Sequence, residues 1–466
     1  MLFSNSIFIF AFLPCVLAGY YGLFRKSRKW QNVFLTCASL FFYAWGEPWF
    51  VLVMIGSILC NWAFALLAGP QLEKKRLAIV GALIVNLGVM FIFKYLAFML
   101  DNINGIVGGG IRVPIINLPI GISFFTFQAM AYVFDVCRGH GKAQKNPLNV
   151  ALYVSFFPQL IAGPIVRYET IAEQIQDRRE TLDDFCSGSC RFIVGLAKKV
   201  LLANTLAYVA DVAFGAQTRS VGLAWLGAFA YTFQIYYDFS GYSDMAIGLG
   251  KMFGFHFLEN FDYPYISRSI TEFWRRWHIS LGTWFRDYLY FPLGGSRVKT
   301  KSRLLFNLFI VWLLTGIWHG ANWTFILWGF MYFVFITVEK LTGLDKFFLK
   351  NRLTSMLGHV YTLFFVMMGW VLFRAESLSE AARYIGDLLG GGSGDIAVAG
   401  FWLRENIVFF IAAAVFSAPI AKWTSDKLEG RKFWQIAYPV VMLTVFFFTL
   451  TFVVKNAYNP FIYFNF

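Results

Sequence analysis

Long apolar runs without charged side chains constrain this chain more than any other feature. Residues 304–338 contain no Lys, Arg, Asp or Glu, and comparable apolar stretches recur along the whole sequence. Charged residues make up 14% of the chain, whereas soluble domains contain about a quarter. Because the runs are continuous and not alternating, they exclude an outer-membrane barrel. The sequence predicts an all-α polytopic membrane protein with roughly ten to twelve transmembrane helices, plus re-entrant or interfacial helices.

The positive charge follows the pattern of membrane loops. The net charge is +14, but the basic residues stand in short loops beside apolar runs, as at residues 25–29 and 74–76. Topogenesis and contact with anionic lipid head groups or substrates explain this placement better than nucleic acid does. We therefore expect membrane lipid as a partner, no nucleic acid, and an N-terminus outside the cytoplasm.

A single ionisable side chain stands in the middle of the uncharged run. His319 lies in the sequence Thr-Gly-Ile-Trp-His-Gly-Ala-Asn-Trp at 315–323. The run is too long for one span of about 20 residues and too short for two spans with a turn. We expect a break at 320–322 that leaves two short helices, with His319 at the turn inside the bilayer. Irregular backbone at that depth lines a wet cavity or is buried in protein, so His319 is the first candidate catalytic residue, with Trp318 and Asn322 lining its pocket.

Residues 268–303 combine aromatic and basic side chains. Trp274, Trp277 and Trp284 recur with Leu281 and Tyr288 at helical spacing, which predicts one aromatic helix face. The segment holds eight basic residues and two acidic ones. It is expected to be interfacial or re-entrant, and an anchor with an aromatic belt is the alternative to a functional role.

His278 favours a functional role for this segment, because it stands among arginines. Arg275, Arg276 and Arg286 are predicted to bind the phosphates of an anionic donor such as a coenzyme thioester. Trp274 and Trp277 are expected to line the pocket. The remaining histidines are interpreted as structural.

Two further segments leave alternatives open. Asp238 and Asp244 flank a Ser-Gly-Tyr-Ser sequence. These residues could line a polar site or orient a histidine, or they could form a helix cap and a turn. The cap and turn are slightly favoured, because Asp and Ser are common at helix ends. Pro158 and Gly163 interrupt residues 148–165 and predict a broken or re-entrant element. The six cysteines form no CxxC pair, and no metal is expected.

Five sequence motifs stand in order along the chain: Phe-Pro-Gln-Leu-Ile-Ala-Gly-Pro at 157–164, Tyr-Asp-Phe-Ser-Gly-Tyr-Ser-Asp at 237–244, Glu-Phe-Trp-Arg-Arg-Trp-His-Ile-Ser at 272–280, Phe-Pro-Leu-Gly-Gly-Ser at 291–296, and the His319 motif. Together they resemble the membrane-bound O-acyltransferase (MBOAT) family, in particular its bacterial alginate O-acetyltransferase branch. The resemblance covers essentially the whole chain and implies a single membrane domain over residues 1–466.

The resemblance implies a ring of helices around a central funnel in the bacterial cytoplasmic membrane. His319 corresponds to the family's central catalytic histidine and His278 to its second polar partner. No cofactor is expected to be bound; acetyl-CoA is the implied acyl donor, and an extracytoplasmic polysaccharide the implied acceptor. Acceptor choice is expected to lie in an extracytoplasmic acyltransferase or carrier partner. Tyr463, in the aromatic tail 460–466, is the implied acyl acceptor, with an interface anchor as the alternative for the tail.

Two other functions remain open at this point. One keeps the enzyme class and changes the donor to D-alanine on an acyl carrier protein, as in the teichoic-acid branch of the same family. The other is a proton-coupled transporter with His319 as a relay, which predicts inverted repeats that are not visible in the sequence.

Overall fold

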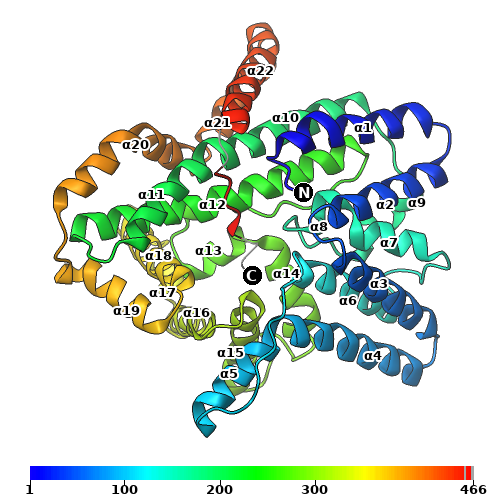
Figure 1. Ribbon diagram of the computed structural model, residues 1–466, viewed down its shortest axis with the longest axis horizontal. Coiled ribbons are helices and arrows are strands. Elements are labelled where there is room, and N and C mark those ends of the chain that lie inside the picture. The colour runs from blue at the N-terminus through cyan, green and yellow to red at the C-terminus, as the bar shows by residue number, and fades with distance from the viewer. Residues whose placement is uncertain (456–457, 463–466) are drawn as a thin grey trace. The chain divides into compact units, whose positions relative to one another are not determined.

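The structure is a computed structural model that describes residues 1–455 and 458–462. Residues 456–457 and 463–466, and with them Tyr463, lie outside the described residues. Apart from one isolated bridge between Ser220 and Ser393, the described chain is built from helices and their connections (Figure 1). The predicted all-α class is confirmed.

The described residues form two compact units. Unit 1 contains Met1–Phe192 and Ser243–Leu258, and unit 2 contains Ile193–Tyr242 and Glu259–Ile462. The helices of unit 1 are α1 (Leu13–Ala18), α2 (Arg28–Ala44), α3 (Phe50–Leu67), α4 (Leu72–Met90), α5 (Leu96–Val107), α6 (Ile122–Arg138), α7 (Pro147–Ser155), α8 (Phe157–Leu160) and α9 (Tyr168–Gln176), with π-helical turns η1 (Phe8–Phe12), η2 (Gly19–Leu23) and η3 (Phe91–Tyr95).

Two helices have residues in both units: α10 (Leu182–Ala197) and α12 (Val221–Met252). The other helices of unit 2 are α11 (Asn204–Gly215), α13 (Ile270–Arg276), α14 (Ile279–Phe285), α15 (Lys301–His319), α16 (Trp323–Thr342), α17 (Leu344–Phe347), α18 (Arg352–Arg374), α19 (Leu378–Gly386), α20 (Ile396–Phe416), α21 (Ile420–Leu428) and α22 (Lys432–Lys455), with η4 (Lys198–Ala203), η5 (Pro264–Ile266), η6 (Arg286–Tyr290) and η7 (Asp387–Gly391).

Eight helical stretches in the described residues are long and apolar enough to cross a membrane, and Phe8–Leu23 is a shorter apolar helix. The protein is therefore a multi-pass membrane protein. In unit 1, α6 packs against α3 and α4, and every side chain from Ile122 to Cys137 is buried. The expected break in 148–165 is present, because α7 ends at Ser155 and α8 begins at Phe157. The expected total of ten to twelve crossings stays a prediction.

The helix pair around His319 agrees with the predicted break but not with the predicted helix lengths. α15 ends at His319 and α16 begins at Trp323, with Asn322 capping it by accepting a hydrogen bond from Thr324 N at 3.0 Å. The two helices have 19 and 20 residues, about 28 to 30 Å each, so the expectation of two short halves is wrong. The helices continue through charged residues at their far ends, which bounded the uncharged run in the sequence.

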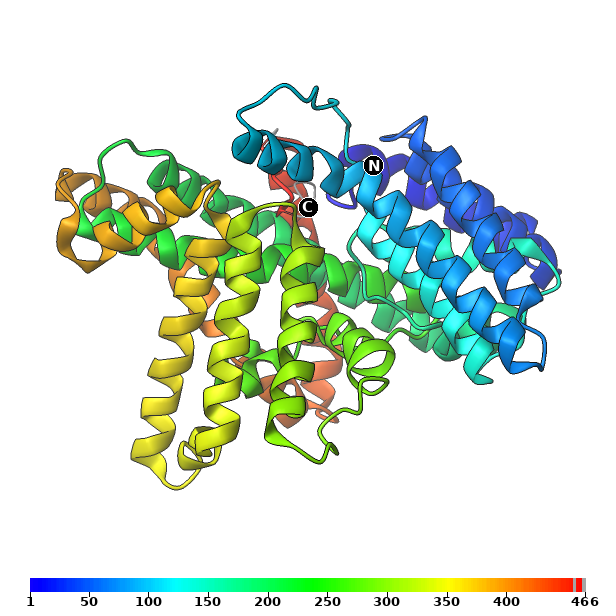
Figure 2. The ribbon, with the colours of Figure 1, turned by 90° about the horizontal axis from the view of Figure 1, so that it is seen from below.

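The helices α15, α16 and α18 run alongside one another in unit 2 (Figure 2). Gly316 on α15 and Gly329 on α16 face each other, and a Cβ on Gly316 would lie 2.5 Å from the Phe325 carbonyl oxygen. Small residues allow two membrane helices to approach this closely. Close packing therefore holds the backbone three residues before His319.

A buried carboxylate connects α16 to the start of α13. Glu339, fully buried, accepts hydrogen bonds from Ile270 N at 2.7 Å and Thr271 N at 2.8 Å. These are among the N–H groups that the first turn of a helix leaves without an intrahelical partner. The contact ties the basic aromatic segment to the helix pair that carries His319.

The aromatic segment is two short helices and not one. α13 ends at Arg276, α14 begins at Ile279, and His278 between them has φ +45°. Trp277 and Trp284 are buried at 3% and 7% exposure, so both rings pack into protein. A backbone break changes the register, which is why helical spacing alone misplaced these side chains on one face.

The Ser-Gly-Tyr-Ser sequence forms no turn. α12 continues unbroken through it, from Val221 to Met252. Gly241 supplies close packing there, because a Cβ on it would lie 2.8 Å from the Gly195 carbonyl oxygen. The slightly favoured interpretation as cap and turn is wrong, since helix packing overrides the turn preference of these residues.

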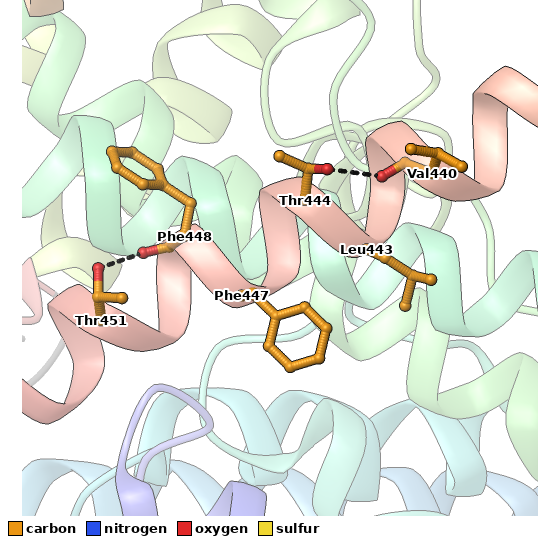
Figure 3. Close-up of a pocket in the computed structure, with 6 residues that line it drawn as sticks. All are labelled: Val440, Leu443, Thr444, Phe447, Phe448 and Thr451. Carbon is orange, nitrogen blue, oxygen red and sulfur yellow. Dashed lines mark hydrogen bonds between the residues drawn. The ribbon is translucent and has the colours of Figure 1, made fainter.

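α22 exposes an apolar face to its surroundings (Figure 3). Leu443, Phe447 and Phe448 are more than half exposed. The hydroxyl groups of Thr444 and Thr451 donate to the helix's own carbonyl oxygens, of Val440 at 2.8 Å and Phe448 at 2.7 Å. A face whose polar groups are satisfied within the helix suits contact with lipid.

Candidate active site

His319 is enclosed by aromatic rings at the end of α15. Its side chain is 4% exposed. Its ring centroid lies 4.9 Å from that of Trp318, 5.0 Å from Trp328 on α16 and 5.1 Å from Phe373 on α18. Three neighbouring helices therefore determine the position of this imidazole.

His278 is held by its backbone and by one amide. Asn260 Oδ1 accepts from Ser280 N at 3.1 Å, which identifies this atom as the oxygen, and it lies 3.2 Å from His278 Nδ1. An amide oxygen only accepts, so Nδ1 carries the proton and Nε2 the lone pair. Burial lowers the pKa of His278 to about 3, so the ring is neutral at pH 7.

The structure brings the two predicted histidines to one tryptophan. The His278 ring lies 6.1 Å from Trp318, the residue directly before His319. The Trp277 ring packs at a tilt against Trp370, with centroids 4.8 Å apart, and Trp370 lies 5.7 Å from Phe373, which contacts His319. The predicted residues Trp277, Trp318 and both histidines thus belong to one aromatic cluster.

Three polar groups in this cluster have no hydrogen-bond partner among the described residues. They are the indole N–H groups of Trp274 and Trp328 and the hydroxyl of Tyr332. The Trp328 ring lies 5.4 Å from Trp274 and 5.0 Å from Tyr332. Buried polar groups in native proteins are nearly always satisfied, so such orphans indicate a place for water or a polar ligand. Unsatisfied donors therefore lie on Trp328, which contacts His319, and on two of the rings that pack against Trp328.

The three predicted donor-binding arginines do not gather in this cluster. Arg275 and Arg276 line a cleft of about 410 Å³ with Arg268, Asp262, Ser269, Thr271, Glu272, Asp345 and Leu349. Arg276 is already paired, 2.8 Å from Asp262 and 3.0 Å from Glu272. Arg286 is exposed and lies 2.8 Å from Asp287. Arg275 is exposed and makes no ion pair with a described residue, so it alone of the three keeps its charge available.

The comparisons decide the family. The profile of the membrane-bound O-acyltransferase family matches residues 117–379, more than half of the chain. This chain belongs to the membrane-bound O-acyltransferase family. It is a membrane O-acyltransferase, as the motif resemblance implied.

Three relatives align with between 55% and 100% of this chain. A probable alginate O-acetylase AlgI of Pseudomonas putida is 39% identical over the whole of both chains. A peptidoglycan O-acetyltransferase of Helicobacter pylori is 37% identical over 84% of this chain and 80% of the relative. A teichoic acid D-alanyltransferase of Bacillus subtilis is 31% identical over 55% of this chain and 69% of the relative.

Two further predicted site residues of this MBOAT chain, Asn322 and Asp238, are engaged with other parts of the protein. Asn322 donates to the Glu376 carbonyl oxygen at 2.9 Å in addition to capping α16, so its amide is engaged in structure. Asp238 lies 2.5 Å from Lys199 Nζ on η4. Its neighbour Phe239 packs on the His278 ring at 4.6 Å.

One group of described residues has the geometry to hold a metal ion. Asp135, His140 and Glu169 bring one ligand atom each within 4.8 Å of one another in unit 1. Glu169 also pairs with Arg167 at 2.9 Å. Because a guanidinium already balances this carboxylate, we interpret the group as an ion-pair cluster, and the expected absence of a metal stays a prediction.

Sequence reasoning missed three buried polar residues that contact predicted site residues or the segment that carries them: Asn260, Lys199 and Glu339. Each is a buried polar residue, with exposure of 0%, 2% and 0%. Charged residues are almost never fully buried unless they are paired, so Lys199 and Glu339 inside apolar stretches were a usable signal. Asn260, in an ordinary polar loop, gave none.

Proposed function

We propose that this MBOAT enzyme moves an acetyl group from cytoplasmic acetyl-CoA across the bacterial cytoplasmic membrane to a polysaccharide outside. His319 is the general base and Tyr463 the transient acyl carrier. His278 is the second catalytic histidine, and a separate extracytoplasmic protein receives the acetyl group or transfers it to the polymer.

The observation that carries this proposal is the enclosed histidine at the α15–α16 turn. His319 is buried against three aromatic rings within the region that matches the family. A base in such a place is shielded from bulk water, which limits hydrolysis of the thioester. The relatives that align over most of the chain are named O-acetylases or O-acetyltransferases of cell-surface polymers, which favours an acetyl donor.

The charge distribution supports a direction for the transfer. Arg297, Lys299, Lys301 and Arg303 precede or begin α15, and basic loops favour the cytoplasmic side. His319 stands at the other end of this helix of 19 residues. The turn then faces the extracytoplasmic half, while Arg275 remains available to donor phosphates from the cytoplasmic side.

The chemistry proceeds in two balanced transfers. His319 takes the phenolic proton as the Tyr463 oxygen attacks the thioester carbonyl; the C–S bond breaks, and the proton passes to the leaving thiolate as CoA-SH. In this proposal the N–H and O–H groups of Trp274, Trp328 and Tyr332 that have no described partner stabilise negative charge on the acyl oxygen. A hydroxyl of the acceptor then attacks the aryl ester, and Tyr463 recovers its proton.

D-alanyl transfer from a carrier protein is the second candidate. It rests on the teichoic acid D-alanyltransferases, which are 31% and 29% identical over about half of this chain. The longer and more similar alignments with O-acetylases favour acetyl.

Two substitutions test the proposal. His319→Ala removes the base and should reduce polymer acetylation by about 10² to 10⁴-fold. Tyr463→Phe keeps the ring but deletes the nucleophilic hydroxyl. Polymer acetylation in this variant should fall nearly to the level of His319→Ala. Acetyl release from isolated polymer is measured at matched membrane abundance. Normal acetylation in the first variant would reject His319 as the base, and in the second would reject the carrier role.

A further inference from the structure

A buried ion pair in unit 2 lies against the last described residues of the chain. Lys199 Nζ is 2.5 Å from Asp238 Oδ1, and the two side chains are 2% and 1% exposed. Lys199 belongs to the apolar stretch Leu182–Gly215, which is long enough to span the membrane. Removing two charges from water is costly, and a buried ion pair is weak evidence of a purely stabilising role.

Both members of the pair bind the main chain of the C-terminal segment. One carboxylate oxygen of Asp238 pairs with the ammonium group of Lys199. The other oxygen accepts a hydrogen bond from Ile462 N at 2.9 Å. Lys199 also donates to the Pro460 carbonyl oxygen. The pair therefore presents an acceptor and a donor to one short peptide, two residues apart along it.

Side-chain contacts fix the same segment at further points. The Phe461 ring lies 5.1 Å from that of Tyr242 and 5.6 Å from Lys199 Nζ. Asn204 Nδ2 donates to Asn459 Oδ1 at 3.3 Å. Phe461 and Ile462 are 4% and 8% exposed, so the segment is seated in protein and does not lie on its surface.

We propose that Lys199 and Asp238 form a clasp for the C-terminal segment that sets where Tyr463 enters the active site. The clasp adjoins the site, because Asp238 precedes Phe239, which packs on His278 at 4.6 Å. The clasped segment ends at Ile462, directly before Tyr463 in the sequence. Lys199 and Asp238 are positioning residues, and their functional consequence rests on the carrier role of Tyr463 proposed above.

A double substitution separates the clasp from simple helix stability. Lys199→Met or Asp238→Leu alone leaves one buried charge unpaired and should lower the amount of folded protein in the membrane. Lys199→Met with Asp238→Leu removes both charges and should restore that amount. It does not restore the contacts with residues 460 and 462. Polymer acetylation per folded protein should therefore stay at least tenfold below the parent level.

The position of the segment is measured directly by thiol labelling. Ile462→Cys, in a background whose six native cysteines are replaced by Ser, keeps the backbone N–H and is buried by the clasp. A maleimide should label residue 462 at least tenfold faster in the double variant than in the parent. A purely structural role of the ion pair would leave this rate unchanged once folding is restored.

The matched control is the ion pair between Arg191 and Asp244, 2.6 Å apart, which joins α12 to the same helical stretch, Leu182–Gly215, that carries Lys199. Arg191→Met with Asp244→Leu should leave both acetylation and the labelling rate of residue 462 near the parent values. Equal effects of the two double substitutions would overturn the clasp.

The outcomes also separate this inference from the proposed function. If Tyr463→Phe keeps acetylation, the carrier role fails, while labelling of residue 462 still decides whether the clasp exists. If Tyr463→Phe loses acetylation but the folded double variant keeps it, with residue 462 protected, the clasp alone is overturned.

A change in the tail itself covers the case in which the double variant does not fold. Ile462→Pro removes the backbone N–H that donates a hydrogen bond to Asp238, and Ile462→Ala keeps this N–H. Polymer acetylation should fall at least tenfold in the proline variant only. With Phe461→Cys as the reporter, maleimide labelling of residue 461 should also become faster in the proline variant only. Equal acetylation in the two variants would overturn the clasp.

Discussion

At the scale of single residues, His278 combines an unusual backbone with a defined protonation state. Its φ of +45° is one of two positive values among the described non-glycine residues, and such a conformation is kept only when the surroundings enforce it. Asn260 provides that enforcement through the contacts to His278 and Ser280. The strain thus places a neutral imidazole beside Trp318.

The neutral His278 has a consequence for stability against pH. Its folded pKa is about 3 and its unfolded value about 6.5, so between these values the unfolded chain binds the extra proton, and stability falls as pH drops. The parent should lose free energy of unfolding as the pH falls from 7.5 to 5.5. We expect this loss to be about 1 kcal/mol smaller in His278→Gln. Melting temperatures are measured in detergent across this pH range. If they fell equally in the two proteins, His278 would not be a neutral buried residue.

Arg275 is the residue whose charge is available to a donor. We expect Arg275→Gln to raise the KM for acetyl-CoA several-fold at low salt, and the difference to shrink as salt screens the phosphate contact. Arg404→Gln is the control, because Arg404 is exposed and pairs with its neighbour Glu405 at 3.2 Å. If Arg275→Gln and the parent had equal KM values across the salt series, Arg275 would not bind the donor. The interpretation of its segment as a membrane anchor would then be favoured.

At the scale of elements, the α15–α16 pair positions His319 through its facing glycines. A Cβ on Gly316 would meet the Phe325 carbonyl oxygen at 2.5 Å, and a backbone atom cannot move aside as a side chain can. The consequence is that separation of these two helices displaces the turn that carries His319.

We expect Gly316→Ala to destabilise the protein by about 1 to 3 kcal/mol and to reduce acetylation. Gly400→Ala on α20, where nothing lies within 4 Å of the added Cβ, should be neutral or stabilising by up to about 1 kcal/mol, because alanine favours helix. Thermal unfolding in detergent compares the two. Equal melting temperatures would mean that α15 and α16 are not closely packed at Gly316.

At the scale of the whole molecule, the orientation of α15 determines which side of the membrane His319 serves. The basic residues before α15 predict a cytoplasmic start, and the helix is about 28 Å long. We expect Ala321→Cys, in a cysteine-free background, to react with an impermeant maleimide added outside intact cells. Ser302→Cys should react only after permeabilisation. The reverse pattern would invert the proposed direction of transfer.

Several features of this protein could be derived from its sequence. Continuous apolar runs require helices in a membrane, because backbone groups in lipid must be satisfied within the segment. The break at 320–322 could be predicted because the uncharged run is too long for one span, whereas the cap that Asn322 forms became visible only in the structure. The motifs around His278 and His319 indicated the family, which the comparisons confirm. The choice of these residues as catalytic stays a prediction.

Tertiary structure alone decided the rest, because those features depend on partners distant in sequence. The ends of α15 and α16 extend past charged residues, which a count of uncharged residues cannot show. Helical spacing predicted one aromatic face where contacts with Asn260 impose a break at His278. Asp238 pairs with Lys199, 39 positions earlier, and with the main chain of Ile462. A buried charge signals that a partner exists, but only the packing of helices identifies that partner.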